Sequence, residues 1–401
     1  MSFAAHPGTL HPGATPPGAA AEALLVLEDG TAFRGRAIGA HGTVLGEAVF
    51  NTGMAGYQEV LTDPSYHRQI VTMTAPQVGN YGLNDEDVES DSIKVAGFVV
   101  REAARRPSSW RSKRDLRTAL AEEGVVGIEG IDTRALTRRL RDHGAMRAGL
   151  STAVLDVDAL LDQVRSSPTM EGQELASEVT APEPFVVPAV GETRFRVVAL
   201  DFGMKRSIRR ELAALGCELH VLPSEATPED VRERQPDGLF LSPGPGDPAT
   251  VAQGIATTRE LLGQVPVFGI CLGSQLLGQA LGAGTYKLAF GHHGVNQPVL
   301  RRSDGGVEIT SHNHGFAVQA STLGEQTGEH TFSTAEHGEV EVSHVNLNDD
   351  VVEGLTARDI PAFSVQYHPE AAPGPTDARH HFVRFVDMIA AHAGATTNGG
   401  R

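Results

Sequence analysis

Cysteine is scarce in this chain of 401 residues, which contains only Cys217 and Cys271. Two thiols exclude a disulfide-rich scaffold and a zinc site built from cysteines, and they are typical of a protein in a reducing cytosol. No apolar run reaches about 18 residues, the length that a membrane-spanning helix needs. The N-terminus also lacks the basic and apolar regions of a signal peptide. We therefore expect a cytoplasmic protein that does not enter a membrane.

Positive charge is in deficit, since 33 Lys and Arg stand against 50 Asp and Glu and give a formal net charge of −17. Such a chain is repelled by phosphate backbones and anionic lipids, so binding to nucleic acid is not expected. The G-x-x-x-x-G-K-S/T pattern of a P-loop is absent as well, so no ATP site is predicted. Hydrophobic residues are plentiful at 40%. They suffice for the cores of roughly two to three domains, the number that the length suggests.

The sequence divides into two blocks that differ in rhythm. Residues 21–188 show strand patterns first and helix patterns later, which favours a mixed α/β domain with a β-rich start. Residues 194–392 alternate short apolar strands with helices, which is typical of a mostly parallel sheet flanked by helices. A linker at 189–193 ends a proline-rich stretch between them. Residues 1–20 are expected to be a disordered tail and residues 393–401 a flexible one. The predicted fold class is α/β.

Cys271 follows an apolar strand pattern and directly precedes a helical segment. Gly269 and Gly273 flank it two residues away on each side, as in the strand-to-helix turn that exposes a catalytic nucleophile. A helix N-terminus stabilises negative charge and so favours the reactive thiolate. A buried packing cysteine is the alternative, and from this turn alone both interpretations of Cys271 are equally supported. Cys217 has no such turn, and we expect it to have a packing role.

A base for this nucleophile is predicted far along the chain, in the segment QYHPE. His368 follows a strand pattern, and Pro369 prevents that strand from continuing. Glu370 is placed to orient the imidazole and to favour its charged form. A histidine after a strand is more often structural, but the acidic neighbour and the distant cysteine turn favour a Cys–His–Glu triad.

Three motifs extend this pattern, namely FLSPGPGDP at 240–248, FGICLGSQLLG at 268–278 and QYHPEAAPGP at 366–375. In this order and at this spacing they are highly specific, and residues 194–390 resemble the class I (triad) glutamine amidotransferase domain. The resemblance implies that the cysteine attacks the side-chain amide of glutamine, forms a glutamyl thioester and releases ammonia.

The resemblance also implies the roles of individual residues. Cys271 is the nucleophile, His368 moves the protons and Glu370 orients His368. Ser274 stands where the family often has a histidine, but that position is not the base. The family's glutamine-binding positions fall on Ser65, Gly244, Gly246, Leu272, Gln275, Asn313, Gly315 and Phe316. Without the resemblance, these glycines would be interpreted as ordinary turn residues.

Further segments are similar to the small subunit of carbamoyl-phosphate synthetase, over nearly the whole chain. They are VFNTGMAGYQEVLTDPSYHRQIV (49–71), IDTRALTRRLRDHGA (131–145), ALDFGMKRSI (199–208), KLAFGHHGVNQPV (287–299) and SHNHGFAV (311–318). This similarity implies a glutaminase subunit of a ligase that passes ammonia to a large subunit. That partner would make carbamoyl phosphate from bicarbonate with ATP, for arginine and pyrimidine biosynthesis. No cofactor is then expected in this chain, whereas ATP and divalent metal are expected on the large subunit, and higher oligomers of the heterodimer are left open.

Two other functions stay in view, a different Cys–His–Glu γ-glutamyl hydrolase or amidotransferase subunit and a non-catalytic regulatory subunit. The long first block argues against the former, and the complete set of triad residues argues against the latter. No metal site is predicted, because the histidines at 292–293, 312, 314 and 380–381 do not combine with carboxylates at helical spacing. Residues 101–147 are locally basic, which indicates a solvated helix face or a contact with an acidic partner surface.

Overall fold

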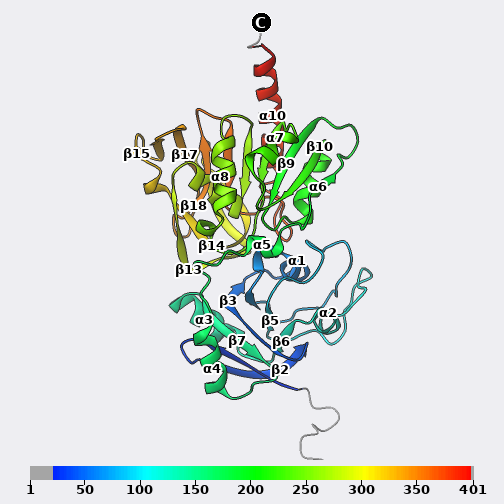
Figure 1. Cartoon of the computed structure of the whole chain (residues 1–401). Helices are drawn as coiled ribbons and strands as arrows, with labels where there is room; N and C mark the ends of the chain where they lie inside the picture. The colour runs from blue at the N-terminus through cyan, green and yellow to red at the C-terminus, as the bar shows by residue number, and fades with distance from the viewer. Residues whose placement is uncertain (1–20, 399–401) are drawn as a thin grey trace, which may run out of the picture.

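The computed structural model describes residues 21–398; residues 1–20, where a tail is predicted, and residues 399–401 lie outside the described range. The chain forms two domains that lie end to end, the first at the bottom of Figure 1 and the second at the top. Each domain is built on a sheet with helices packed against it, which confirms the predicted α/β class. Among the described residues, no helix is long and apolar enough to cross a membrane.

A closed barrel forms the first domain, with its strands in the order β1-β2-β6-β5-β4-β3-β7. The strands are β1 (Glu22–Leu27), β2 (Ala32–Gly39), β3 (Thr43–Asn51), β4 (Gln69–Met73), β5 (Gly97–Val100), β6 (Val126–Glu129) and β7 (Met146–Ser151). From β3 through β4 and β5 to β6 the neighbours are parallel, and the other pairs are antiparallel. Closure leaves the barrel without an unpaired strand edge.

Strand β1 shows why an uninterrupted apolar run suits this barrel. Leu25 and Leu27 belong to an apolar cluster that includes helix α3 (Thr133–His143). Leu24 and Val26, which point to the opposite face, pack against helix α4 (Val157–Ser166). Both faces of the strand are therefore buried, so alternation with polar residues is not needed. The other helical segments of this domain are α1 (Tyr57–Thr62), the short turn η1 (Pro64–Tyr66), α2 (Leu116–Glu122) and α5 (Ala176–Val179).

The second domain contains a sheet of 12 strands, whose main path runs β14-β13-β17-β18-β19-β12-β11-β9-β10-β8. Its strands are β8 (Phe185–Val187), β9 (Phe195–Asp201), β10 (Cys217–Pro223), β11 (Gly238–Leu241), β12 (Val267–Ile270), β13 (Gly284–Arg301), β14 (Gly306–Gln319), β15 (Glu325–Gln326), β16 (Thr331–Thr334), β17 (Gly338–Asn346), β18 (Val352–Ala357) and β19 (Ala362–Val365). Its helices are α6 (Arg206–Ala214), α7 (Pro228–Glu233), α8 (Ala252–Leu261), α9 (Leu272–Ala280) and α10 (His380–Asn398), with short turns η2 (Pro248–Thr250) and η3 (Ala320–Thr322).

Three details of the second domain differ from the prediction. The sheet is parallel only at its centre, from β10 through β9, β11 and β12 to β19, because the later strands are joined by hairpins, which require antiparallel pairing. Strand β8 pairs with β10, although the prediction places it in the first domain; a proline-rich stretch can still form an edge strand. Helix α10 continues to Asn398, past the predicted start of the tail at 393, because its alanines favour helix.

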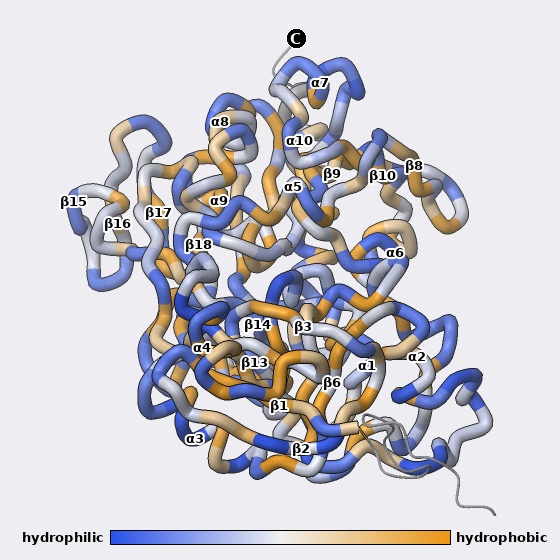
Figure 2. Tube along the Cα trace, turned by 60° about the horizontal axis from the view of Figure 1, so that its bottom comes forward, coloured by the Kyte–Doolittle hydropathy of each residue, from blue (hydrophilic) through white to orange (hydrophobic). Residues whose placement is uncertain are grey.

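An aromatic core lies directly beneath the carboxyl ends of the central strands. Phe268 of β12 stacks on Phe363 of β19 with ring centroids 4.5 Å apart, and it also contacts Phe382 and Phe385 of α10. Figure 2 shows that hydrophobic residues of the described part of the chain gather in the strands, whereas hydrophilic residues are frequent in the peripheral loops. The loops that follow β12 and β19 therefore rest on closely packed, rigid strands.

Candidate active site

Cys271 lies at the carboxyl end of β12, between that strand and helix α9. Its backbone has φ 55° and ψ −109°, a conformation that a non-glycine residue adopts only at a cost in free energy. The two flanking glycines let the backbone pass closely enough for this turn. A Cβ at Gly269 would lie 2.4 Å from the Gly273 carbonyl oxygen, and one at Gly273 would lie 2.2 Å from the Leu241 carbonyl oxygen. The turn thus places the thiol at a helix N-terminus, where negative charge is stabilised.

His368 and Glu370 lie in the loop after β19, and their side chains interact. His368 Nδ1 is 2.7 Å from Glu370 Oε1, so the carboxylate accepts the Nδ1 hydrogen and leaves Nε2 for another partner. The His368 backbone N–H donates to the Ser311 carbonyl of β14 at 2.8 Å, which anchors the loop. Cys271, His368 and Glu370 are each at most 2% exposed. The structure therefore brings together the three residues that the sequence predicts as a triad.

A fourth charged residue, Lys205, belongs to this arrangement. Its Nζ lies 2.9 Å from Glu370 Oε1 and donates to the Ala372 carbonyl at 2.5 Å. Lys205 is only 1% exposed, and a buried ammonium is costly unless it is paired. The sequence does not point to Lys205 as a site residue. One signal in the sequence could have identified it. Lys205 follows the buried strand pattern of β9 by only four residues, and a lysine in such a position is expected to be buried and to need a charged partner.

The charges of this group shift two pKa values in opposite directions. Burial by itself raises the pKa of Glu370, but Lys205 and His368 outweigh burial and lower that pKa to about 2. Burial lowers the pKa of His368, but the Glu370 charge and the interaction with Cys271 outweigh it and raise that pKa to about 10. At neutral pH, Glu370 is therefore charged and His368 carries a proton. An imidazolium beside the Cys271 sulfur stabilises the thiolate.

Residues of both domains line a small cavity in front of Cys271. Seven of the eight predicted glutamine-binding residues line it, namely Ser65, Gly244, Gly246, Gln275, Asn313, Gly315 and Phe316. The eighth, Leu272, packs its side chain into the apolar core. Only the backbone of Leu272 can therefore act in the cavity.

The first turn of helix α9 leaves one backbone donor near the thiol. The Gly273 N–H donates to the Ser242 carbonyl, and the N–H groups of Ser274 and Gln275 donate to the Cys271 carbonyl. Among the hydrogen bonds of residues 21–398, the Leu272 N–H has no acceptor, as is usual for the first residue of a helix. It is the natural donor to an oxyanion formed next to Cys271.

The first domain reaches this cavity through the turn η1. Asp63 Oδ1 accepts from the Ser65 N–H at 2.9 Å, and Asp63 Oδ2 accepts from Asn313 Nδ2 at 3.2 Å. The carbonyl of Asn313 lies 3.6 Å from Cys271 Sγ. The Ser65 hydroxyl is buried and has no hydrogen-bond partner within the described part of the chain. A buried hydroxyl of this kind is available to a bound ligand.

Six residues that line the cavity are not among the predicted site residues, namely Glu47, Gln69, Met170, Pro245, Lys287 and His314. Three of them, Glu47, Gln69 and Lys287, form one polar group. Lys287 Nζ lies 2.7 Å from Glu47 Oε1, and Gln69 donates to Glu47 Oε2 at 2.9 Å. A larger neighbouring cavity of about 520 Å³ shares Glu47 and Lys287 as wall residues. These three side chains come from β3 and β4 of the first domain and from β13 of the second. They meet only because the two domains pack together, so no spacing in the sequence indicates the contact.

Comparisons with known proteins agree over both domains. Two family models match, "Carbamoyl-phosphate synthase small chain, CPSase domain" over residues 25–150 and "Glutamine amidotransferase class-I" over residues 198–388. A carbamoyl phosphate synthase small chain of Streptomyces avermitilis is 58% identical over 370 residues, which cover 92% of this chain and 96% of the relative. Those of Mycolicibacterium paratuberculosis and Syntrophotalea carbinolica are 52% and 50% identical and cover 92% of this chain and 98% of each relative. The chain belongs to the carbamoyl-phosphate synthase small chain family.

Family membership confirms the predicted resemblance over both domains. The first family model spans the barrel from β1 to β7, which supplies Ser65 to the cavity, and the second spans the domain that carries Cys271. As a carbamoyl-phosphate synthase small chain, the protein is the glutamine-hydrolysing subunit of that enzyme and has a large-subunit partner.

Proposed function

We propose that this chain hydrolyses L-glutamine to glutamate and ammonia with Cys271 as nucleophile, His368 as acid and base, and Glu370 as the residue that orients His368. One observation supports the proposal best. A buried series of ion pairs runs from Lys205 through Glu370 to His368. His368 Nε2 has no hydrogen-bond partner among the described residues and is left for Cys271, which lines a cavity formed by both domains.

The reaction begins when the Cys271 thiolate attacks the side-chain amide carbon of glutamine. A C–S bond forms and the amide oxygen becomes negative. The C–N bond then breaks, His368 donates its Nε2 proton to the leaving nitrogen, and ammonia departs from a γ-glutamyl thioester. Water next attacks the thioester while His368 accepts its proton. The C–S bond breaks, glutamate leaves and the thiolate is restored.

Backbone groups around Cys271 stabilise the developing charge and hold the substrate. The Leu272 N–H donates to the oxyanion, with a second donor from the loop that carries Gly244 and Gly246. Each such donor contributes about 3–4 kcal/mol to transition-state stabilisation. The α-amino and α-carboxylate groups of glutamine are bound by Ser65, Gln275, Asn313, Gly315 and Phe316.

The ammonia passes to the large subunit, which uses bicarbonate and ATP to make carbamoyl phosphate for arginine and pyrimidine biosynthesis. Ammonia becomes ammonium in bulk water, so we expect a closed path between the subunits. Glutamine hydrolysis itself uses no cofactor under this proposal, and ATP and divalent metal belong to the large subunit. The heterodimer acts in the cytoplasm and binds neither membrane nor nucleic acid, and its higher oligomers are left open.

The basic zone at 101–147 bears on the contact with that partner. Most of its charges pair within the chain, as in Arg111–Asp87, Arg114–Glu122, Arg117–Glu129, Arg139–Asp29 and Arg147–Glu28. This pairing favours a solvated face for most of the zone. Five arginines of the zone are exposed and form no ion pair with the described residues, namely Arg101, Arg105, Arg106 and, on helix α3, Arg134 and Arg138. They are the part of the zone that an acidic partner surface would contact.

Replacing the nucleophile in the complex with the large subunit tests the proposal. We expect Cys271→Ser to lower glutamine-dependent carbamoyl phosphate synthesis by at least about a thousandfold and to spare synthesis from added ammonium chloride. The matched control is Cys217→Ser, which should keep both activities. Glutamine-dependent synthesis by Cys271→Ser at the wild-type rate would contradict the proposal, and loss of both activities would show a broken complex.

A further inference from the structure

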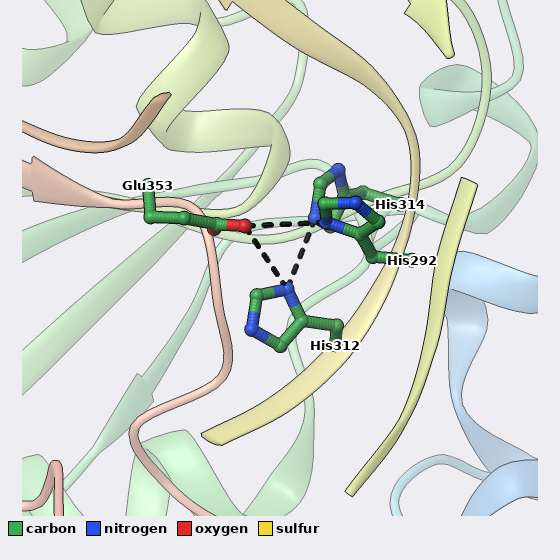
Figure 3. A group of neighbouring side chains, drawn as sticks. All are labelled: His292, His312, His314 and Glu353. Atoms are coloured by element: carbon green, nitrogen blue, oxygen red, sulfur yellow. Dashed lines mark hydrogen bonds and ion pairs between the residues drawn. The ribbon is translucent and has the colours of Figure 1, made fainter. Parts of the chain in front are cut away.

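Three histidines and a glutamate meet in the interior of the second domain. They come from three strands and form what we call the histidine cluster: His292 on β13, His312 and His314 on β14, and Glu353 on β18. Figure 3 shows their ring nitrogens and a carboxylate oxygen pointing toward one another. Each residue is at most 5% exposed. The sequence does not predict this convergence, because no helical spacing joins positions on separate strands.

Hydrogen bonds on the outer side of two rings show which nitrogens carry hydrogen. His314 Nδ1 lies 2.8 Å from the Phe316 carbonyl, which only accepts, so Nδ1 is protonated and Nε2 of the neutral ring has a lone pair. The Thr310 hydroxyl donates its one hydrogen to the Gln297 carbonyl at 2.9 Å. His312 Nε2, 2.7 Å from that hydroxyl, must therefore donate to it. This leaves His312 Nδ1 with a lone pair.

His292 and Glu353 face the same point. His292 Nε2 lies 2.8 Å from Asp349 Oδ2, which accepts its hydrogen, and His292 Nδ1 lies 3.2 Å from Glu353 Oε1. The Asn346 side chain donates to Glu353 Oε1 at 3.0 Å. Glu353 Oε2 is buried and has no hydrogen-bond partner among the described residues. A buried carboxylate oxygen without a partner is costly and calls for a positive neighbour.

The contact between His312 and His314 is the feature that requires an explanation. Two nitrogens that both carry lone pairs lie 3.1 Å apart. Two facing lone pairs repel unless a cation lies between them.

The distances among the inner atoms suit a tetrahedral metal ion. Metal–ligand bonds of about 2.0–2.1 Å in a tetrahedron separate neighbouring ligand atoms by about 3.3 Å. The observed separations are 3.1 Å for His312 Nδ1 to His314 Nε2, 3.2 Å for His292 Nδ1 to Glu353 Oε1, and 3.6 Å for His312 Nδ1 to Glu353 Oε1. One ligand atom from each residue lies within 4.8 Å of all the others.

We propose that the histidine cluster binds one Zn²⁺ ion in a structural site. Three imidazole nitrogens and one carboxylate oxygen are ligands that zinc accepts, and four protein ligands leave no open position for water or substrate, as in structural zinc sites. Each ring already donates from its other nitrogen to a fixed acceptor, which orients it toward a metal. Asp349, about 40% exposed at its side chain, connects the cluster to the surface.

The site would stabilise the strand that borders the catalytic cavity. Successive residues of a strand point to opposite faces. His312 and His314 therefore share one face of β14, and Asn313 between them faces the other way. The Asn313 carbonyl is the atom 3.6 Å from Cys271 Sγ. Zinc would join β14 to β13 and β18 beside the catalytic cavity, which His314 also lines, and so would hold in place the strand that carries the Asn313 carbonyl.

A proton is the competing occupant of part of this site. A proton on His292 Nδ1 would satisfy Glu353 Oε1. It would not relieve the repulsion between the lone pairs of His312 and His314, and it would give Glu353 Oε2 no partner. One zinc ion would bind all four residues.

Metal analysis of the full-length chain tests the proposal without relying on activity. The chain purified from zinc-supplemented culture should contain about one zinc per molecule by plasma mass spectrometry. His312→Gln and Glu353→Gln should each weaken zinc binding at least about tenfold, with unchanged far-ultraviolet circular dichroism. The control is His344→Gln, since His344 is also buried but belongs to a separate group with Glu308 and His381. It should retain the zinc.

If the cluster variants do not fold, the wild type alone decides. Zinc is removed with a chelator and titrated back in competition with a coloured chelator, while the melting temperature is followed. One-to-one uptake with a rise in melting temperature, and anomalous scattering from zinc at the histidine cluster, supports the site. Purified chain without zinc that takes up none, equal binding by wild type and folded cluster variants, or loss only in His344→Gln would each overturn the proposal.

Discussion

The central parallel strands have their amino ends on one side of the sheet and their carboxyl ends on the other, and we call these two sides the amino edge and the carboxyl edge. One cysteine lies at each edge, and the two thiols have different surroundings. Cys217 begins β10 at the amino edge, whereas Cys271 follows β12 at the carboxyl edge. Both are buried, at 0% and 2% exposure. Burial raises the pKa of Cys217 to about 11, so this thiol stays neutral, while Cys271 lies beside a protonated His368. Burial alone therefore does not decide what a thiol does, because the neighbouring charges and the helix terminus decide it.

Alkylation should separate the two thiols most strongly. At pH 8, we expect iodoacetamide to modify Cys271 in the folded full-length chain at least about a hundredfold faster than Cys217, because only Cys271 has an imidazolium neighbour and a cavity. Peptide mass spectrometry over a time course measures both rates. In urea, where neither environment persists, the rates should become similar. Equal rates in the folded chain would remove the distinction between the two edges.

Removal of one carboxylate at each edge should give the next largest difference. Glu370→Gln leaves Lys205 buried without its partner, so we expect glutaminase kcat to fall by roughly 10²–10⁴-fold and the free energy of unfolding to fall by about 3–5 kcal/mol. Glu218→Gln, beside Cys217, breaks only partly exposed ion pairs and should cost under about 1 kcal/mol. Kinetics and urea unfolding measure these effects.

A double variant tests whether the stability lost in Glu370→Gln comes from leaving Lys205 buried without a partner. Lys205→Met with Glu370→Gln removes both members of the buried pair, so much of the lost stability should return while the activity stays low. Equal unfolding free energies for the single and the double variant would show that the pair is not coupled.

Replacement of a glycine by alanine at each edge should give the smallest difference between the two edges. A Cβ at Gly273 would lie 2.2 Å from a backbone oxygen of β11. One at Gly216, where φ is +84°, would lie 2.8 Å from the flexible Arg194 side chain and 3.3 Å from the Glu192 carbonyl oxygen. We expect Gly216→Ala to cost about 1–2 kcal/mol of unfolding free energy. Gly273→Ala should cost more, up to about 3 kcal/mol, and should also lower kcat. Thermal unfolding and glutaminase assays check this, and the reverse order of stability would contradict it.

Local patterns explain which parts of the site were predictable. Gly269, Cys271 and Gly273 describe one turn within five residues, and His368 with Glu370 describe another. Lys205, Glu47 and Lys287 have no such pattern, because their partners lie on other elements. The same limit applies to the fold, where the edge strand β8 and the end of helix α10 depend on weak local signals and on neighbours distant in sequence.

The sequence by itself determined the α/β class, the two turns that carry Cys271 and His368, and the resemblance that the family comparisons confirm. Only the tertiary structure decided which charges meet: Lys205 with Glu370, Lys287 with Glu47, and three histidines with Glu353. The reason is physical. Turns and strands follow from interactions between near neighbours in the chain, whereas burial and charge pairing depend on how distant strands pack together, and these set the protonation state and reactivity of each group.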